Sequence, residues 1–576
     1  MLLALWARLG AAADHPLWSP LKRWAMGKAP SWAAGEGVML GVWGTGKLRL
    51  GEGALTAWLH PSGPAGSPVE ARGPELRCVG RTLVAAVGPV PQYPLYYHRA
   101  ADDSVLAVSS ELRALLALVD ADINEPRLVS LIVGCEDADR GATVYRRLRR
   151  LQPCETIYAD QDGIRLGRTF PRAGAEFLGE GPEELASELR RRVDASIGRA
   201  IEGSRRVTVL AGGGLDSAGV VALASARLGA EGRELRVLAH SCATPGDDRP
   251  HLVELERHLG FSAQRESPRT AAPWFLHSLC ADAQPAPYMG TCLDMHLLLA
   301  AREPSSVTLT GHAGDAVFGG RIDFSTFLRR GHPFRAMATA VKLRVPSRVG
   351  APKRIARWVV GPVLRPFVPG ALIRARRRGR MRRPWMTERF RQLLDASIRS
   401  NPIELPRTPD EELAAYCSSS ALAESATTWG QIASVTGATA VDIFCDLSIV
   451  CLMAQTDPAV RCHGHMARGL YRLALRGLVP DSVRLRVDKA AGQPMLAEAA
   501  LEAHALASLE DLSSLEALAD LGLVVPFTFR SAFSDWLRAV RRGERLERDP
   551  SDECWHLVWQ LLSVERFVRQ ARLGWA

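Results

Sequence analysis

Short runs in which apolar and polar residues alternate dominate the first part of the chain, up to about residue 175. The stretches "GVMLGVW", "RTLVAAVG", "SVLAVSS" and "ETIYADQDGIRLGRT" have this character, and clusters of Gly and Pro separate them. Only "ELRALLALV", after Ser110, has the apolar spacing of a helix. This pattern predicts a sheet-based domain over residues 1–175.

Between about residue 180 and residue 325 the pattern changes to helices alternating with buried strands. Helical spacing in "EELASELRRRVDASIGRAI" is followed by the apolar run "RVTVL" and then by the helical "SAGVVALASARL". The alternation continues through "ELRVLAHS", "RPHLVELERHLG" and "SVTLTG". It predicts βαβ units, and therefore a parallel sheet covered by helices. After about residue 388 nearly all of the chain has helical spacing.

A glycine-rich turn joins "RVTVL" to the following helix, at the carboxyl edge of the predicted sheet, where ligands bind. Gly212, Gly213 and Gly214 allow backbone N–H groups to approach an anion closely, and Ser217 adds a hydroxyl at the helix start. The turn matches neither the Walker A pattern nor G-x-G-x-x-G. Because Asp216 lies inside this anion site, we expect Mg²⁺ between its carboxylate and a polyphosphate.

A second strand of the predicted sheet also ends at a glycine-rich turn, in "SVTLTGHAGDAVFGG". This turn carries His312 and Asp315. Asp216 and Asp315 would then present two carboxylates to one metal ion bound to ATP. The alternative is that Asp315 is only a helix N-cap.

Together the two turns resemble the asparagine synthetase family of ATP-pyrophosphatases. The S-G-G-x-D-S loop of that family corresponds to residues 212–217, with Gly212 in place of the first serine. Its second motif corresponds to "TGHAGDAVFGG", with Ala313 in place of a glycine. "ALRGLVPDSVRLRVDKAAG" resembles the stretch that carries the phosphate-binding lysine, here Lys489. The resemblance implies these nucleotide-binding residues: Leu210, Gly212, Gly213, Gly214, Asp216, Ser217, Gly311 and Lys489.

The resemblance also implies a fold. "YPLYYHRAADDSVLAVSSELRALL" and "RRLRRLQPCETIYADQDG" are similar to the late part of the family's N-terminal glutaminase-type domain. We therefore expect an α/β protein with a degenerate glutaminase-type (Ntn-like) αββα domain over residues 1–175. A parallel-sheet ATP-pyrophosphatase domain with a largely helical C-terminal part would follow over residues 176–576.

The chemistry implied by the resemblance is attack of a carboxylate on the α-phosphate of ATP, followed by displacement of AMP by an amine. A glutaminase would need a cysteine at its mature N-terminus, but position 2 is Leu2 and no cysteine precedes Cys78. Family branches without this cysteine use an amine already on the substrate. They are the β-lactam and carbapenam synthetases and the cyclases that form the isopeptide ring of lasso peptides.

His312 favours the cyclases among these branches. Asparagine synthetases carry a glutamate at this position and β-lactam synthetases a tyrosine, whereas lasso cyclases commonly show T-G-H-G-G-D. A histidine is a suitable base for a peptide α-amine, whose reference pKa is about 7.7 to 8.0. The expected catalytic residues are His312 and Lys489. Open alternatives are His312 as a hydrogen-bonding turn residue, a small-molecule lactam synthetase, an ammonia-dependent ligase, and a non-catalytic scaffold that binds a precursor peptide.

Composition places these domains in a soluble, cytoplasmic protein. The chain has 576 residues, long enough for two or three domains, and its eleven cysteines are scattered without a C-x-x-C pair. This spacing argues against a disulfide framework and against a zinc ribbon. No stretch is long enough for a transmembrane helix.

The net charge of +10 is concentrated in one segment. Residues 329–387 hold 17 Lys and Arg and no Asp or Glu, so the remainder of the chain sums to −7. We interpret this segment as an insertion that is either simply solvated or contacts an anionic partner. The expected partners are a precursor peptide, the leader peptidase and leader-binding protein of the same pathway, and an anionic membrane surface. Nucleic acid is not expected, because no recognition motif accompanies the charge.

Overall fold

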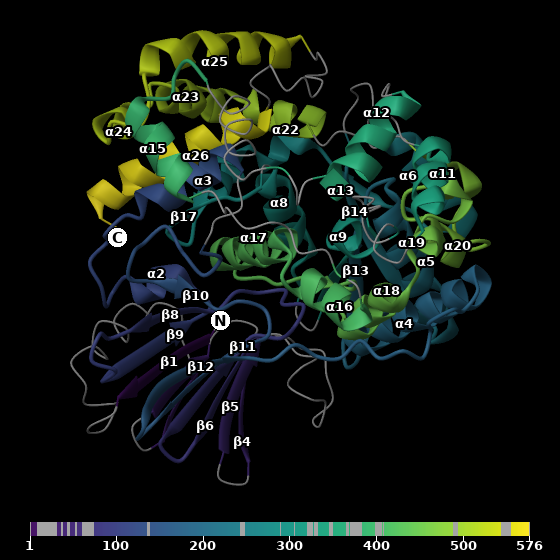
Figure 1. The fold of residues 1–576 in the computed structure, drawn as a ribbon, viewed down its shortest axis with the longest axis horizontal. Helices are drawn as coiled ribbons and strands as arrows, with labels where there is room; N and C mark the ends of the chain where they lie inside the picture. Colours follow the sequence, from purple (N-terminus) through teal and green to yellow (C-terminus); the bar gives the residue numbers. More distant parts are fainter. Residues whose placement is uncertain are drawn as a thin grey trace.

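A computed structural model gives the fold of the chain, drawn in Figure 1. The residues that it describes are 2–7, 31–35, 38–42, 46–51, 54–59, 74–134, 139–241, 248–288, 290–303, 306–319, 327, 332–344, 350–364, 368, 383–397, 406, 408–487, 493–542 and 555–574.

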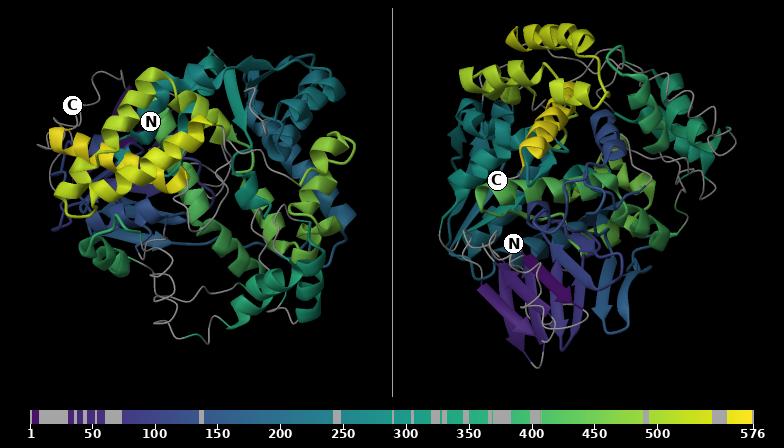
Figure 2. Two further views of the ribbon diagram at one scale, coloured as in Figure 1. Left: turned by 90° about the horizontal axis from the view of Figure 1, so that it is seen from above. Right: turned by 90° about the vertical axis from the view of Figure 1, so that its left-hand side faces the viewer.

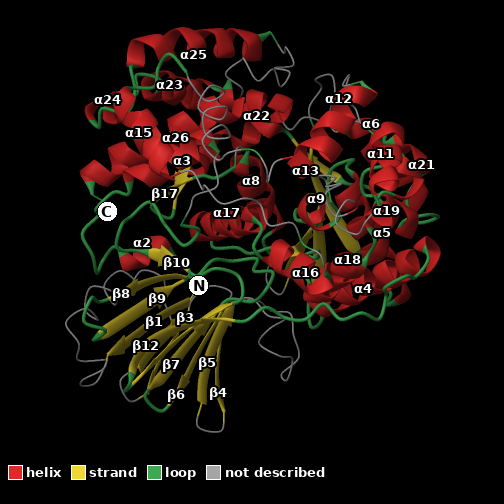
Figure 3. Cartoon of the chain, in the orientation of Figure 1, coloured by secondary structure: helices red, strands yellow, loops and turns green. Residues whose placement is uncertain are grey.

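Two antiparallel six-stranded sheets form the N-terminal part and lie together at one end of the molecule (Figures 1 and 3). The first has the order β10-β8-β9-β1-β3-β2 and the second the order β12-β11-β7-β6-β5-β4. The strands of the first sheet are β1 (Leu2–Ala7), β2 (Ser31–Gly35), β3 (Val38–Val42), β8 (Tyr96–Arg99), β9 (Val105–Ser109) and β10 (Arg149–Arg150). Those of the second are β4 (Gly46–Gly51), β5 (Ala54–Leu59), β6 (Glu75–Val79), β7 (Thr82–Ala86), β11 (Glu155–Asp160) and β12 (Gly163–Arg168).

Strand β1 lies in the interior of the first sheet, between β3 and β9. Its residues from Leu2 to Trp6 are almost completely buried, as their uninterrupted apolar sequence requires. The N–H of Leu2 donates to Ser110 Oγ at 2.9 Å, and the N–H of Ser110 donates back to the Leu2 carbonyl at 3.0 Å. Position 2 is therefore a packed core position.

The predicted parallel sheet is confirmed. It has five strands in the order β15-β14-β13-β18-β19, and every neighbouring pair is parallel. These strands are β13 (Arg206–Leu210), β14 (Leu235–His240), β15 (Gln264–Glu266), β18 (Ser306–Thr310) and β19 (Val441–Asp442). The helices around and between them are α4 (Pro182–Ile201), α5 (Leu215–Ala230), α6 (Arg249–Leu259), η3 (Pro268–Trp274), α7 (Phe275–Leu279), α8 (Thr291–Ala301) and α9 (Gly314–Val317). A hairpin of β16 (Cys280–Ala281) and β17 (Gln284–Pro285) precedes α8.

The described residues of the basic insertion are mostly helical. Its helices are α11 (Pro333–Lys342), α12 (Ala351–Ile355), the π-helix η4 (Ala356–Val360) and α13 (Gly361–Leu364). A small apolar cluster around Phe327, Ala336 and Ala340 holds this part together. The N–H of Arg344 donates to the carbonyl of His465 at 2.8 Å, which attaches the insertion to the loop before α20.

The C-terminal part is largely helical, as predicted, and its helices pack on two different regions. They are α15 (Glu388–Ser397), α16 (Pro409–Cys417), α17 (Ser420–Thr436), α18 (Leu447–Gln455), α19 (Pro458–Arg461), η6 (His463–His465), α20 (Gly469–Ala474), α21 (Asp481–Arg484), α22 (Gln493–Ala500), α23 (Ala503–Leu512), α24 (Glu516–Asp520), α25 (Pro526–Arg541) and α26 (Trp555–Leu573). Helices α16 and α18–α21 lie beside the parallel sheet, whereas α15 and α22–α26 lie above the N-terminal sheets (Figures 1 and 2).

One continuous apolar core joins the N-terminal sheets to the last helices. It contains Trp6 and Leu106 from the first sheet together with Leu561 and Phe567 from α26. Helix α3 (Glu125–Val133) packs against both α15 and α26. The parallel sheet has a separate core. The division of the chain near residue 175 remains a prediction.

Two further observations concern membrane-crossing helices and the state of the cysteines. None of the helices in the described part of the chain combines the length and the apolar character needed to cross a bilayer. Eight cysteines fall in the described ranges and all are free thiols.

Candidate active site

The glycine-rich turn after β13 lies tightly against the start of α6. A Cβ atom at Gly213 would come within 2.4 Å of the Asp248 carbonyl oxygen and 2.7 Å of His251 Cβ. Only glycine fits there without displacing backbone. The turn therefore needs its glycine for packing as well as for the approach of an anion.

Helix α5 begins directly after this turn, with Gly214 at its N-cap. The first-turn amides of a helix have no intrahelical acceptor and attract anions. Asp216 and Ser217 lie in this first turn, and Ser217 Oγ is 3.3 Å from the Gly214 carbonyl and 3.4 Å from that of Gly212. The predicted glycines and Ser217 therefore share one small region at the carboxyl end of β13. Leu210, the last residue of β13, is buried beneath it.

The second glycine-rich turn lies directly against the first. A Cβ atom at Gly314 would come within 2.5 Å of Asp216 Cγ, and one at Gly311 within 3.3 Å of the Asp216 carbonyl oxygen. Ala313, which replaces a family glycine, has φ −71° and ψ −4°, a conformation open to any residue. Its methyl group is buried without strain.

Asp315 lies inside the first turn of α9, and Ala313 occupies the N-cap position of that helix. The side chain of Asp315 is 44% exposed, whereas that of Asp216 is 18% exposed. Asp315 is therefore not the N-cap residue of α9.

The two aspartates meet at the guanidinium of Arg468. Its Nη1 forms ion pairs with Asp216 Oδ2 and with Asp315 Oδ1, the latter at 3.0 Å. Burial alone would lower the pKa of Arg468, but Asp216 and Asp315 raise it above its usual range. The sheet topology thus places both predicted carboxylates around one cationic group.

This donor set suits a magnesium ion that arrives with a nucleotide. Two carboxylates supply the hard oxygen ligands that Mg²⁺ prefers, and phosphate oxygens and water would complete the shell. Within the described ranges there is no group of three or more His, Cys, Asp or Glu side chains that could hold a metal ion alone. The residues therefore fit a metal shared with ATP.

A second arginine borders the first turn. Arg486 Nη1 lies 2.5 Å from Asp248 Oδ1 and 3.5 Å from the Gly213 carbonyl oxygen. Its side chain is only 9% exposed. Both Arg468 and Arg486 thus add positive charge beside the proposed phosphate site.

His312 lies at the carboxyl end of β18 and is exposed. Its ring makes edge contacts with Trp429 of α17, at 5.9 Å between ring centroids, and with Tyr288, at 6.4 Å. Exposure and aromatic neighbours would let the imidazole meet a substrate at this edge.

Two acidic residues interact electrostatically with His312. Asp442, which ends β19, accepts hydrogen bonds from the N–H groups of Ala313 at 2.7 Å and Phe444 at 3.1 Å. Burial raises the pKa of Asp442 to about 6, and the charge of His312 opposes that rise. Burial also raises the pKa of Asp294 in α8, again opposed by His312. Acid and base groups thus surround the end of β18.

One predicted site residue cannot be placed. Lys489 lies outside the described residues. Conversely, sequence reasoning missed Arg468, Asp442 and Arg486. Asp442 ends a strand of two residues, which is too short to give a pattern, and Arg468 has no motif of its own.

Comparisons with known proteins identify the family. The family model for asparagine synthase matches residues 188–568, which is more than half of the chain. No curated protein matches.

Similar solved structures include glutamine phosphoribosylpyrophosphate amidotransferase from B. subtilis, complexed with ADP and GMP. It is 12% identical, with 47% of this chain and 82% of that chain covered and a TM-score of 0.19. Another is described as the allosteric regulatory enzyme of purine biosynthesis; it is 11% identical, with coverages of 46% and 81% and a TM-score of 0.17. Superpositions this poor carry no argument about the present chain. The family match does, and the chain therefore belongs to the asparagine synthase family, whose members use ATP to form carbon–nitrogen bonds.

Proposed function

We propose that this protein closes the macrolactam ring of a lasso peptide. In this reaction the side-chain carboxylate of an Asp or Glu in a precursor peptide attacks the α-phosphate of ATP and releases pyrophosphate. The N-terminal amine of the same peptide then attacks the acyl-adenylate, forms the isopeptide bond and releases AMP.

The ATP half of the proposal rests on the two glycine-rich turns. The amides of the first turn and the hydroxyl of Ser217 would hold the phosphates, with Gly311 at the adjoining turn. Asp216 and Asp315 would hold Mg²⁺, which neutralises charge on the phosphates when bound. Lys489, outside the described residues, would neutralise the phosphate of the adenylate.

The main support for an amine on the substrate, rather than ammonia from glutamine, is the buried position of Leu2. Its hydrocarbon side chain is fully buried in the core, at the position where the resemblance puts the glutaminase nucleophile. A buried leucine offers no nucleophile, so ammonia would not come from glutamine at this site. An amine on the substrate itself then becomes the simplest acceptor.

His312 would receive the proton of that amine. A peptide α-amine with a pKa near 7.7 to 8.0 is about a tenth neutral at pH 7, and a neighbouring imidazole can take up the remaining proton. The charges of Asp294 and Asp442 interact with His312. Holding amine and adenylate together could supply about 7 to 11 kcal/mol of the barrier.

The proposed partners follow from the same pathway: a precursor peptide, its leader peptidase and a leader-binding protein. We place the reaction in the cytoplasm, because free thiols and a nucleotide-dependent reaction suit that compartment. The basic insertion would contact an anionic partner.

The test is to incubate the protein with ATP, Mg²⁺ and the leaderless core of a precursor peptide encoded beside its gene. Mass spectrometry should show the loss of one water, with the N-terminal amine and one acidic side chain joined. The same preparation should release no glutamate from glutamine. A primary amide formed from added ammonia, with no ring, would instead support the ammonia-dependent ligase. Absence of pyrophosphate release with the folded protein and this peptide would support the scaffold.

A further inference from the structure

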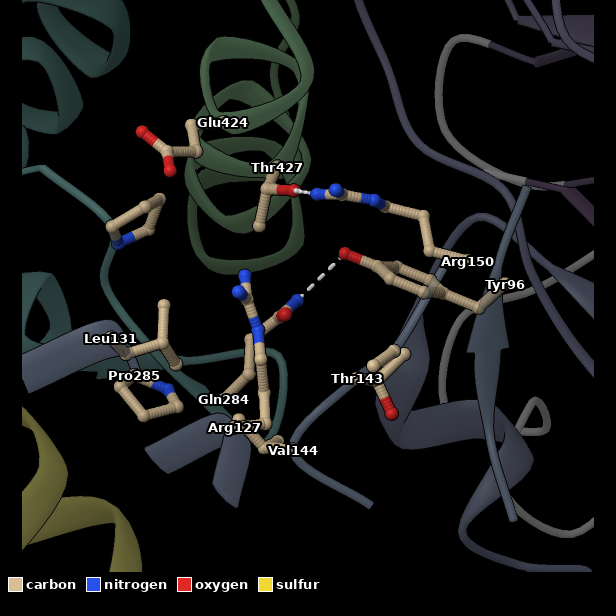
Figure 4. Close-up of a pocket in the computed structure, with 12 residues that line it drawn as sticks. Tyr96, Arg127, Leu131, Thr143, Val144, Arg150, Gln284, Pro285, Glu424 and Thr427 are labelled. Atoms are coloured by element: carbon tan, nitrogen blue, oxygen red, sulfur yellow. Dashed lines mark hydrogen bonds between the residues drawn. The ribbon is translucent and has the colours of Figure 1, made fainter. Parts of the chain in front are cut away.

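A second pocket lies between the N-terminal sheets and α17, where Figure 4 shows its side chains. It has two adjoining lobes, both partly open to solvent, that share Arg127, Arg150 and Glu424. Arg140 lines the second lobe. We call this pocket, defined by Arg127, Arg140, Arg150 and Glu424, the arginine pocket.

Arg150 is bound only by neutral acceptors in the described part of the chain. Its guanidinium donates to Thr427 Oγ1 at 2.8 Å, and to the carbonyls of Ala423 and Arg140, each at 3.3 Å. No carboxylate of the described residues lies within ion-pair distance of it. Burial lowers the pKa of Arg150. The charges of Glu424 and Glu155 act on Arg150 only from beyond ion-pair distance. A largely desolvated guanidinium without an ion-pair partner is energetically costly, and an anion would relieve that cost.

Other charged residues also line the pocket. Among the described residues these are Arg127, Arg140 and one acidic side chain, Glu424. In Figure 4 the side chains of Arg127 and Arg150 extend toward one another beneath α17, whereas the carboxylate of Glu424 points away from both. Two guanidinium groups facing one cavity attract a planar, bidentate acceptor such as a carboxylate.

The first lobe also has an apolar wall. Leu131, Val144, Pro285 and Pro287 line it, and Figure 4 shows Leu131, Val144 and Pro285 around the base of Arg127. A hydrocarbon stem next to a carboxylate would bury its surface against this wall. Inorganic phosphate has no stem, so the lining favours an organic acid.

The arginine pocket is distinct from the site at His312, although both contact α17. Ser420, Ala423, Glu424 and Thr427 follow one another at the spacing of a single helix face, and all four line the pocket. Trp429, which contacts His312, is rotated by about 180° from that face, because successive residues turn by about 100°. Helix α17 therefore separates the two sites.

We propose that the arginine pocket binds a ligand that carries a carboxylate on an apolar stem, either an acidic peptide segment or a small dicarboxylic acid. The guanidinium groups of Arg127 and Arg150 would bind the carboxylate, and the apolar wall would contact the stem. This binding needs neither ATP nor Mg²⁺, so it can be tested independently of the ligase function.

Isothermal titration calorimetry of the whole protein without ATP tests the proposal. The probes are succinate, its neutral analogue succinamide, acetyl-Ala-Asp-Ala-amide and the corresponding Asn peptide. We expect binding of succinate, of the Asp peptide or of both, and at least about tenfold weaker binding of the matching neutral probe. Tighter binding of succinate would identify the ligand as a free dicarboxylic acid, and tighter binding of the Asp peptide would identify it as an acidic peptide segment. Absence of binding by both acids, equal binding of acids and neutral probes, or equally strong binding of inorganic phosphate would overturn the proposal.

Variants of the pocket assign the binding to its residues. Arg150→Gln and Arg127→Gln should each weaken binding of the preferred acid about tenfold, and Glu424→Gln should strengthen it. Arg190→Gln is the matched control, because Arg190 also donates to carbonyls, those of Ala474 and Arg476, but lies outside the pocket. Circular dichroism and thermal melting identify any variant that fails to fold. If Arg150→Gln does not fold, the Arg127→Gln variant provides the test. Wild-type affinity in a folded Arg127→Gln variant would contradict the assignment.

Discussion

Gly314 lies against the carboxylate of Asp216 so closely that a Cβ atom at position 314 would come within 2.5 Å of Asp216 Cγ. The two residues belong to different strand-end turns. Their contact fixes the spacing between the two halves of the proposed ATP site. The absence of a side chain at position 314 is therefore a requirement of the site.

Gly314→Ala should abolish most peptide-dependent pyrophosphate release, because the new methyl group would push Asp216 out of its position. The fold should persist, since Gly314 has no left-handed backbone angle that an alanine would strain. Gly229→Ala on α5 is the control: no atom lies within 4 Å of its added Cβ, and a helix gains about 0.5–1 kcal/mol from this change. A pyrophosphate assay and thermal melting check both. Full activity in Gly314→Ala would contradict the packing argument.

Asp216→Asn and Asp315→Asn should each lower pyrophosphate release on the order of 10²-fold or more, because each removes a charge that would hold Mg²⁺. The concentration of Mg²⁺ needed for half-maximal rate should rise in whatever activity remains. Asp194→Asn is the control, since Asp194 also pairs with an arginine, Arg227 at 2.7 Å, and has an exposure close to that of Asp315, but lies on α4. If either variant releases pyrophosphate at the wild-type rate, the substituted aspartate does not hold the metal ion.

The strand-end aspartates were predictable because each follows the end of a buried apolar run by five or six residues. "RVTVL" and "SVTLT" are read as strands from the sequence, and parallel pairing brings their carboxyl ends to one edge. Their local sequences therefore carry nearly all the information about Asp216 and Asp315. The parallel sheet and the helical C-terminal part were predicted correctly for the same reason.

Arg468 and Asp442 depend instead on contacts between distant segments. Arg468 lies in a left-handed turn (φ 57°) more than 150 residues after Asp315, and nothing in "CHGHMARG" indicates which carboxylates it will meet. The sequence likewise predicts helices after residue 388 without showing that the last of them return to the N-terminal sheets. Such placement is set by complementary apolar faces, which a pattern of helical spacing does not identify.

His312→Ala should separate the two half-reactions of the proposed ligase. Adenylation, measured as pyrophosphate exchange into ATP with the peptide present, should stay within a few-fold of wild type. Ring closure should slow by about 10²–10⁴-fold, since a positioned proton acceptor contributes that much. Quenched-flow mass spectrometry follows the ring. Loss of both half-reactions together would assign His312 to ATP binding or to folding.

Asp442 should make the folded state less stable as the pH rises. Its pKa is about 6 when folded, against an ordinary value of 3.8, so the folded protein holds this proton more tightly than the unfolded chain. Its contribution to the free energy of unfolding is then full below pH 4 and is lost as the pH rises to about 6, on the order of 3 kcal/mol in total.

The Asp442→Asn variant lacks this titration, so its change in stability with pH reports the contribution of all other titratable groups. Urea unfolding at pH 4.5 and pH 7.5 should show the wild type losing stability relative to this variant between the two values. A difference independent of pH would mean that the folded carboxylate is already ionised.

Neutralising the basic insertion should weaken association with an anionic partner. The residues to change to Gln are Arg376, Arg377, Arg378, Arg382 and Arg383, of which only Arg383 falls within the described residues. Binding to vesicles containing phosphatidylserine and to the precursor peptide should fall, and its dependence on salt should flatten, because the attraction is screened. The corresponding Arg→Lys variant keeps the charge and should behave like wild type. If binding is unchanged at low and high salt, the insertion does not bind an anionic partner and is simply solvated.

The shared core has a consequence for how the protein is made. Tyr145 packs edge-on against Phe567, with ring centroids 5.7 Å apart, so the first sheets to leave the ribosome are completed by one of the last helices. At about 5–20 residues per second, the apolar face that α26 covers stays open on the order of tens of seconds during synthesis. Native packing of the N-terminal sheets is thus postponed until translation is nearly complete, which makes the nascent chain a natural client for chaperones that shield apolar surface.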